Sequence, residues 1–391
     1  MNFDEIIDRK QTNSMKWDAL KERYKSDDVW PMWVADMDFK VPEVVQKALH
    51  NVTEHGVFGY HFPPASLREA IVEWMDKRFA WTINQEDITF TPGVVPAIHQ
   101  LISVLTEEGD GIIVQPPVYY PFFALVNTNR RTLLENELVE RNGTYEIDFD
   151  DLEEKMKSGA KMLILCNPHN PGGRMWNKEE LTKIAVLAKQ YDVTIVSDEI
   201  HSDITFRGNH VPFASLEAAK GLQVATCMAP SKTFNLAALQ LSYVISNQRE
   251  LQQKLELSMR QNFTGIGNPY SSAAAEAAYR EGEQWLTNML AYVRDNIDYA
   301  EKRLKEEMPK IDFVDPDATY LLWMDFRQLE MDDQALQQWL REEARLALND
   351  GHTFGKPGSG FARMNLACPR SHVEEGLNRL KQAYDRLQQP Q

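Results

Sequence analysis

Three polar side chains of complementary chemistry each follow a short apolar run of the sequence. Asn170, Asp198 and Lys232 supply, in chain order, a neutral amide, a carboxylate and an amine. These groups suit pyridoxal phosphate (PLP), whose ring hydroxyl, ring nitrogen and aldehyde need a hydrogen-bond donor, an anion and a lysine. The sequence therefore predicts a PLP enzyme that acts on amino acids.

Lys232 is the residue on which this prediction depends most. It lies in the run Ala229–Asn235, and a lysine condenses with an aldehyde through its neutral amine, a form that desolvation favours. Ser231 beside it is predicted as a further cofactor contact. Taken alone, Lys232 would be interpreted as an exposed loop lysine, because the Gly-x-x-x-x-Gly-Lys pattern of a phosphate loop is absent.

Asp198 is expected to face the pyridine nitrogen. A buried carboxylate needs a positive partner, and a protonated ring nitrogen is one. A turn or helix-capping aspartate explains Asp198 equally well in isolation, and the neighbouring acids Glu199 and Asp203 have weaker claims. His201 could reach the region of the ring hydroxyl, although a packed histidine is the simpler interpretation of that residue alone.

Backbone geometry supports two further cofactor contacts. Asn170 lies between two prolines that restrict its backbone, so its amide can be held toward the ring hydroxyl; an ordinary proline-rich turn is the alternative. Gly93, Val94 and Val95 follow an expected strand and open an expected helix. Free N–H groups at a helix start bind phosphate well, and glycine permits close approach.

Three more residues have side chains suited to the cofactor or the substrate. Tyr119 could stack on the cofactor ring, although most aromatic residues are core residues. Tyr60 lies in a glycine-punctuated loop and could donate to the phosphate. Arg363 lies in a strand-like run, and its planar fork suits a substrate carboxylate; the alternative is a surface arginine on an edge strand.

The middle of the chain alternates between strand and helix patterns, which predicts βαβ units and a mostly parallel sheet. Ligands of such sheets bind at the carboxyl ends of the strands, where Asn170, Asp198 and Lys232 are expected to lie. Asn177 with Glu180 predicts a capping box at one helix start. The expected strands are 88–90, 112–114, 162–166, 193–196 and 224–227, and the expected helices include 64–80 and 95–105.

The last third of the sequence has a different pattern, which predicts a small α+β domain. One or two long helices over 271–308 precede strands at 320–325 and 361–366, with helices near 332–346 and from about 371. We expect an N-terminal segment (1–45) that packs with the small domain, a large PLP-binding domain (46–285) and a small C-terminal domain (286–391).

Composition excludes several classes of protein. The chain has 391 residues, 43% of them hydrophobic, with a net charge of −16, which argues against a nucleic-acid partner. Its three cysteines predict neither a disulfide framework nor a zinc site. The sequence shows no signal peptide and no run of ~18 apolar residues, so we expect a cytoplasmic protein without a membrane partner.

Six motifs carry a resemblance that runs along nearly the whole chain. The sequence resembles the fold-type-I PLP enzymes of the class I/II aminotransferase superfamily, and more closely the bacterial C–S lyases, or cystathionine β-lyases, of the PatB/MalY group. That resemblance implies an α/β large domain with a mostly parallel seven-stranded sheet between helices. The motifs are Met32–Phe39, Thr91–Val95, Gln115–Tyr119, Cys166–Pro171, Ser197–His201 and Ala229–Asn235.

The resemblance implies roles for the residues that match the motifs. Lys232 carries the cofactor, Asp198 pairs with the ring nitrogen, and Asn170 provides the amide. Arg363 binds the substrate α-carboxylate, and Tyr119 lies under the ring.

Other implications come from the resemblance alone. Tyr60 matches a tyrosine that reaches the phosphate across a homodimer with shared active sites, and the segment with Trp33 and Ala35 matches one that closes over the substrate. Typical aminotransferases have an arginine at the position of Gln240 and a tyrosine at that of His201. Both departures favour the C–S lyases.

The expected reaction is a β-elimination on a small sulfur amino acid. Cystathionine or a cysteine S-conjugate would lose its thiol, homocysteine in the case of cystathionine, and the remainder would hydrolyse to pyruvate and ammonia. Lys232 would take the α-proton as general base. An aminotransferase with the same cofactor contacts is the first alternative, and a purely binding role, such as contact with a transcription activator, is the second.

Overall fold

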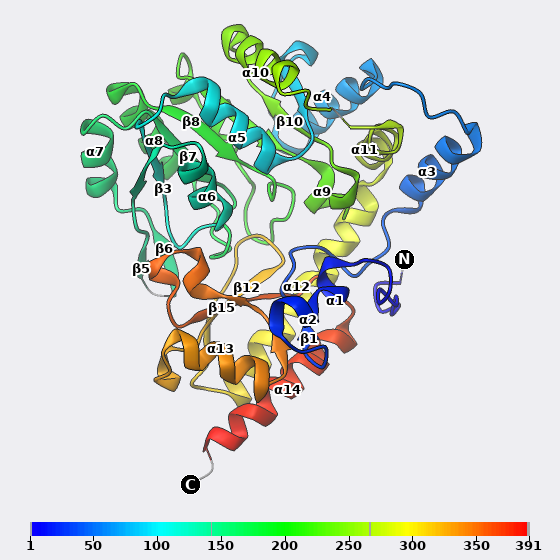
Figure 1. Ribbon diagram of the computed structural model, residues 1–391, viewed down its shortest axis with the longest axis vertical. Coiled ribbons are helices and arrows are strands. Elements are labelled where there is room, and N and C mark those ends of the chain that lie inside the picture. The colour runs from blue at the N-terminus through cyan, green and yellow to red at the C-terminus, as the bar shows by residue number, and fades with distance from the viewer. Residues whose placement is uncertain (1, 142, 266, 389–391) are drawn as a thin grey trace.

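A seven-stranded sheet forms the centre of the larger part of the molecule (Figure 1). The computed structural model describes residues 2–141, 143–265 and 267–388. One strand, β10, runs antiparallel to both neighbours, and the other pairings are parallel, which confirms the mostly parallel sheet predicted from the sequence. The strand order is β2 (Ile88–Thr91), β10 (Ser242–Ile245), β9 (Val224–Met228), β8 (Thr194–Asp198), β7 (Met162–Cys166), β3 (Gly111–Val114) and β4 (Thr132–Glu135).

Helices cover both faces of this sheet, and the alternation along β7 shows why. Ile164 and Cys166 pack on one face, whereas Leu163 and Leu165 pack on the other, because successive side chains of a strand point to opposite sides. The first face is covered by α5 (Val94–Leu105), α6 (Pro121–Thr128) and α10 (Arg249–Gln261), the second by α7 (Phe149–Lys157) and α8 (Lys178–Tyr191).

The larger part contains, in the residues described, four further α-helices and one pair of short strands. The predicted capping box is confirmed at the start of α8, where Asn177 accepts from the Glu180 N–H and the Glu180 carboxylate accepts from the Asn177 N–H. The expected helix 64–80 is α4. The four helices are α3 (Glu43–His55), α4 (Ala65–Phe79), α9 (Pro230–Thr233) and α11 (Pro269–Glu281), and the two strands are the antiparallel pair β5 (Val139–Arg141) and β6 (Thr144–Glu146).

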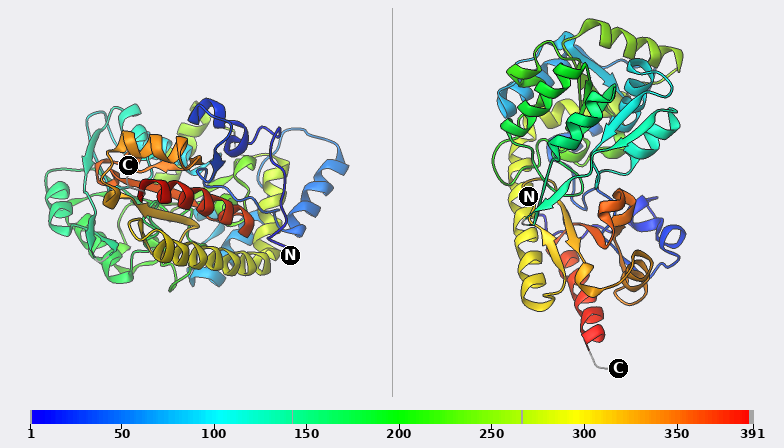
Figure 2. Two further views of the ribbon diagram at one scale, coloured as in Figure 1. Left: turned by 90° about the horizontal axis from the view of Figure 1, so that it is seen from below. Right: turned by 90° about the vertical axis from the view of Figure 1, so that its left-hand side faces the viewer.

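A second, antiparallel sheet forms the C-terminal part, beside α12 (Glu283–Glu307), which runs from the larger part into it (Figure 2). The two predicted strands are present, but the sheet has four, because two strands of three and two residues are too short to produce a sequence pattern. Its order is β11 (Asp312–Val314), β12 (Leu321–Asp325), β15 (Phe361–Asn365) and β14 (Asn349–Asp350), with α13 (Asp333–Glu342) and α14 (Arg370–Gln388) packed beside it.

The N-terminal segment lies against this C-terminal part. Its strand β1 (Trp30–Pro31) pairs in parallel with β13 (Leu346–Ala347), after the short helices α1 (Met15–Asp18) and α2 (Leu20–Tyr24). Because residues 346–347 form β13, the helix predicted over 332–346 ends earlier, at Glu342.

The domain limits at 45 and 285 stay predictions. Within the described ranges, no helix combines the length and hydropathy that a bilayer span requires.

Candidate active site

A cavity of ≈ 320 Å³ lies beyond the carboxyl ends of the parallel strands, between the two parts of the molecule. Its size falls within the range of small-molecule sites. The structure brings eleven of the thirteen predicted site residues to its wall and leaves out Tyr60 and Ser231. The residues in the wall are Trp33, Ala35, Gly93, Val94, Val95, Tyr119, Asn170, Asp198, His201, Lys232 and Arg363.

Asp198 ends β8 and presents a buried carboxylate to the cavity. The Ile200 N–H donates to its Oδ1 at 3.1 Å, so the turn contact considered from the sequence is real. Within the described part of the chain, no cationic side chain lies within 4.0 Å of the carboxylate, and burial raises the pKa of Asp198 to about 7. The positive charge of Lys232 acts on the carboxylate only from beyond that distance, so a cationic group of a ligand could pair with it directly.

Lys232 projects from α9 into the same cavity, and its Nζ donates to the Ala35 carbonyl oxygen at 2.5 Å. The alternative of an exposed loop lysine is therefore wrong. Burial, together with the positive charge of Arg363, lowers the pKa of Lys232 to about 8. Near neutral pH a useful fraction of this amine is uncharged and nucleophilic, as a lysine that condenses with an aldehyde must be.

This pKa predicts a distinctive reactivity for Lys232 in protein freed of bound ligands. Because the pKa is lowered, the amine is neutral above pH about 8, whereas ordinary lysines lose their proton near ~10.4. We expect amine-selective labelling of Lys232 to rise through pH about 8. Peptide mass spectrometry would measure it, with exposed Lys254 as the internal control, and parallel rise of both residues would contradict the prediction.

Arg363 is buried in β15, which pairs with β12 on one side and β14 on the other. The alternative of a surface arginine on an edge strand is therefore wrong. Its guanidinium donates to the Asn170 Oδ1 at 2.8 Å and to the Asn349 Oδ1 at 2.6 Å. Its Nε has no acceptor, and no carboxylate lies within 4.0 Å of it among the residues described. A buried cation with neutral partners suits a carboxylate-bearing ligand.

Replacing Arg363 by lysine tests this use of the guanidinium. A lysine keeps the charge but loses the planar fork, so we expect kcat/KM for an amino-acid substrate to fall by about 10- to 100-fold, mainly through KM. Steady-state kinetics would measure the change, and Arg386→Lys, at an exposed position on α14, is the matched control. Equal kinetics for the two variants would contradict the role.

Asn170 and His201 leave polar atoms free at the cavity. The Asn170 side-chain oxygen is occupied by Arg363, so its Nδ2, which has no acceptor in the described residues, is available to a ligand. His201 is buried, and its Nδ1 has no hydrogen-bond partner among the described residues. Burial, followed by the charges of Lys232 and Arg363, lowers the pKa of His201 well below the usual range. The neutral ring also contacts Tyr320 edge-on, so packing and ligand contact are compatible.

The start of α5 forms the opposite side of the cavity. Gly93 precedes the helix with an extended backbone, and the N–H groups of Val94 and Val95 have no acceptor in the described chain. A Cβ at position 93 would come within 3.2 Å of the Pro96 Cδ. Unpaired N–H groups and the helix dipole favour an anion such as phosphate here.

Other predicted residues occupy less decisive positions. Tyr119 lines the cavity, and burial raises its pKa to about 12, so it stays a neutral phenol. Ser231 lies outside the lining because neighbouring helix positions point about 100° apart. Tyr60 is fully exposed and does not line this cavity. Gln240 is exposed as well.

Sequence reasoning missed the residues that hold the N-terminal segment over the cavity. Tyr320 donates through its hydroxyl to the Ala35 carbonyl oxygen at 3.0 Å. Asn365 donates through Nδ2 to the carbonyl oxygens of Val34 and Asp36, each at 2.6 Å. The period-2 pattern of a strand places Asn365 on the same face as Arg363, which is the signal that could have identified it.

Comparisons with known proteins agree with this fold and site. The model of the family "Aminotransferase class I and II" matches residues 33–380, and the chain belongs to this family. Cystathionine beta-lyase PatB of Bacillus subtilis (strain 168) is 44% identical over 98% of this chain and 100% of its own. Protein MalY of Escherichia coli (strain K12) is 32% identical over 96% of this chain and 97% of its own.

A solved structure extends the likeness to three dimensions. Cystalysin from Treponema denticola, whose crystal structure contains a pyridoxal 5'-phosphate cofactor, superposes with a TM-score of 0.95 and 35% identity, covering 99% of both chains. The resemblance to the PatB/MalY group and the fold-type-I architecture, both predicted from motifs, are confirmed.

Proposed function

We propose that this protein is a PLP-dependent carbon–sulfur β-lyase, which cleaves L-cystathionine or cysteine S-conjugates to a thiol, pyruvate and ammonia. One observation carries the proposal: the amine of Lys232, the carboxylate of Asp198 and the guanidinium of Arg363 converge on one cavity. The chain that presents them is 44% identical, over nearly its full length, to a cystathionine β-lyase.

The free polar atoms of the cavity fit PLP. Asp198, which has no ion pair with any residue that the structure describes, offers its carboxylate to a protonated ring nitrogen, and Asn170 offers Nδ2 to the ring hydroxyl oxygen. The N–H groups of Val94 and Val95, which have no acceptor in the described part of the chain, suit the phosphate. Cavity and donors therefore present the three kinds of partner that the cofactor needs, and Tyr119 supplies an aromatic wall.

Bound PLP supplies an acceptor for the negative charge that develops on the substrate Cα during the reaction. The buried Asp198 keeps the ring nitrogen protonated, because its own charge is otherwise unbalanced. Arg363 holds the substrate α-carboxylate, and Asn170, fixed by that same arginine, is held in place beside it.

Lys232 transfers the proton that leaves the substrate Cα. Its neutral amine takes the proton from the substrate Cα as general base, and the lowered pKa places it near the working pH. The carbonyl oxygen of Ala35 accepts a hydrogen bond from Nζ and so orients the amine. With the Cα proton removed, the bond from Cβ to sulfur breaks, and the thiolate leaves.

Incubation with L-cystathionine in the absence of any 2-oxo acid separates this proposal from an aminotransferase. A lyase releases pyruvate continuously, which lactate dehydrogenase and NADH detect. An aminotransferase releases none without an amino acceptor, so absence of pyruvate, with activity restored by a 2-oxo acid, would favour the alternative.

We also propose a homodimer in which Tyr60 reaches the partner subunit's phosphate site. Four large apolar side chains, Val57, Phe58, Tyr60 and Phe62, are exposed within one short segment, and contiguous exposed apolar surface is typical of an interface. Sedimentation analysis at micromolar concentration would test the assembly, and a monomer with full activity would contradict it.

A further inference from the structure

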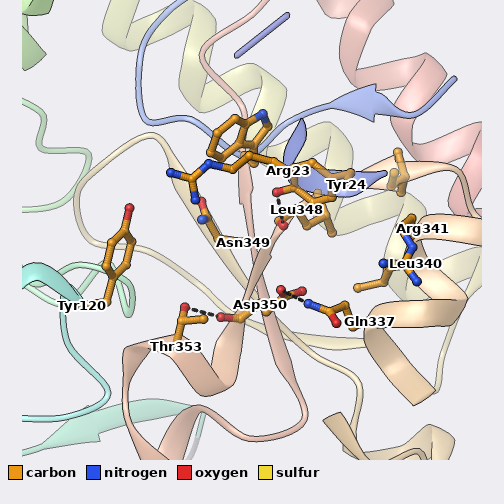
Figure 3. A pocket seen from close by; sticks show the side chains of 12 residues that line it. Arg23, Tyr24, Tyr120, Gln337, Leu340, Arg341, Leu348, Asn349, Asp350 and Thr353 are labelled. Atoms are coloured by element: carbon orange, nitrogen blue, oxygen red, sulfur yellow. Dashed lines mark hydrogen bonds between the residues drawn. The ribbon is translucent and has the colours of Figure 1, made fainter. Parts of the chain in front are cut away.

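Figure 3 shows the lining of a second cavity, which has a volume of ≈ 180 Å³ and adjoins the active-site cavity. The two share the lining residues Arg23, Trp33, Tyr120 and Asn349. Asn349 accepts a hydrogen bond from Arg363, so it stands between the proposed binding place of the substrate α-carboxylate and this second space. A group attached to the far side of the substrate sulfur can therefore extend into the second cavity.

One wall of the second cavity carries a negative charge. Asp350 is half-buried in β14, and the Gln337 Nε2 donates to its Oδ2 at 2.5 Å. No cationic nitrogen within the described ranges lies within 4.0 Å of the carboxylate. Arg341, which also lines the cavity, pairs with Glu342 at 3.2 Å, and its positive charge acts on Asp350 only from beyond that distance. Burial raises the pKa of Asp350. An ammonium group that enters the cavity would pair with this carboxylate and favour its charged form, because Asp350 lines the cavity and has no ion pair among the described residues.

Another part of the wall carries a positive charge. The Arg23 guanidinium lies 5.1 Å above the centre of the Trp33 ring, and Figure 3 shows it extending over Asn349. Within the chain as described, it has neither a carboxylate within 4.0 Å nor a side-chain hydrogen bond. Arg23 is exposed on α2 and lines both cavities. Its contact with the Trp33 ring favours a guanidinium position at their junction, where it can bind a carboxylate.

We propose that this second cavity binds the amino-acid group at the distal end of the substrate, with Asp350 paired to its ammonium and Arg23 to its carboxylate. The inference rests on the proposed β-lyase function and names its substrate class: thioethers that carry an amino acid at each end. Cysteine derivatives with a plain alkyl group on sulfur leave both charges of the cavity unpaired, so they are poorer substrates.

Four substrates that differ only beyond the sulfur test the pairings. S-Ethyl-L-cysteine has no distal charge, S-(2-aminoethyl)-L-cysteine has an ammonium, S-(2-carboxyethyl)-L-cysteine has a carboxylate, and L-cystathionine has both. For Asp350→Asn, we expect kcat/KM relative to that for S-ethyl-L-cysteine to fall about 10-fold for both ammonium-bearing substrates. For Arg23→Gln, the same ratio should fall about 10-fold for both carboxylate-bearing substrates.

Matched controls remove one charge outside both cavities. Glu330→Gln alters an exposed acid, and Lys21→Gln alters an exposed base on the same helix as Arg23; both should keep the wild-type ratios. Each kcat/KM ratio compares two substrates on the same protein preparation. Partial misfolding of a variant lowers both values alike, so it does not change the ratio.

The outcomes are distinguishable from failure of the proposed function. If wild-type protein releases pyruvate from none of the four substrates, the lyase proposal fails. If it cleaves them but Asp350→Asn and Arg23→Gln lower all four rates equally, the lyase stands and the distal site is overturned. Kd values of the same ligands for the Lys232→Ala holoprotein, measured by calorimetry, should show the same selectivity without turnover.

Discussion

Replacing Lys232 by alanine is expected to lower pyruvate release from L-cystathionine by about 10⁴-fold or more. The variant loses the amine that joins the cofactor aldehyde and, with it, the base that takes the Cα proton. The Nζ contact with the Ala35 carbonyl oxygen disappears as well. A coupled pyruvate assay measures the rate, and the visible absorbance of the purified protein reports the loss of the covalent link to the cofactor.

Two variants give this experiment its controls. Lys254→Ala removes an exposed lysine on α10 and should leave both readouts unchanged. Lys232→Arg keeps a positive charge at the site, but a guanidinium neither condenses with an aldehyde nor gives up its proton, so it should fail as alanine does. Wild-type rate and absorbance in Lys232→Ala would remove the lysine from the mechanism.

The second large effect is expected for Asp198→Asn, which should lower kcat/KM by about 10²- to 10³-fold. An asparagine keeps the size of the side chain and still accepts from the Ile200 N–H, the contact seen at 3.1 Å. It cannot supply the negative charge that holds a proton on the ring nitrogen. Steady-state kinetics with L-cystathionine measures the loss, and cofactor absorbance checks that PLP remains bound.

A stability measurement separates this charge effect from damage to the fold. Because burial raises the pKa of Asp198 to about 7, its folded form holds a proton that the unfolded chain releases. Its contribution to stability therefore falls as pH rises from about 4 to about 7. Asparagine does not titrate, so the Asp198→Asn apoprotein does not lose stability in this way as the pH rises. At pH 8 it should melt at a higher temperature than the wild-type apoprotein.

The matched control for this variant is Asp192→Asn. Asp192 ends α8 in the left-handed conformation, with φ of 56°, which asparagine also tolerates. The Asp192→Asn change removes one carboxylate close to β8, at the end of that strand away from the cavity, so catalysis should not change. An equal loss of kcat/KM in the two variants would contradict a special role for Asp198.

Local patterns in the sequence identified most of the large sheet and the polar groups at its edge. The apolar run of β7 and the capping box at Asn177 each involve residues close in sequence, so their physics is visible in a short window. The same holds for a polar residue that follows a strand, as Asp198 does. Parallel strands then bring such residues to one edge.

Only the tertiary structure decided which distant groups meet in the cavity. The Arg363–Asn170 bond joins residues 193 positions apart, and the Lys232–Ala35 bond joins residues 197 apart. The sequence also did not reveal that Arg363 is buried between two strands, or that Arg23 and Asp350 have no ion pair in the described parts of the chain. A side chain's partners depend on packing between elements. The sequence determined the chemical groups and the local elements that carry them, whereas packing of the two parts decided their pairing, burial and pKa.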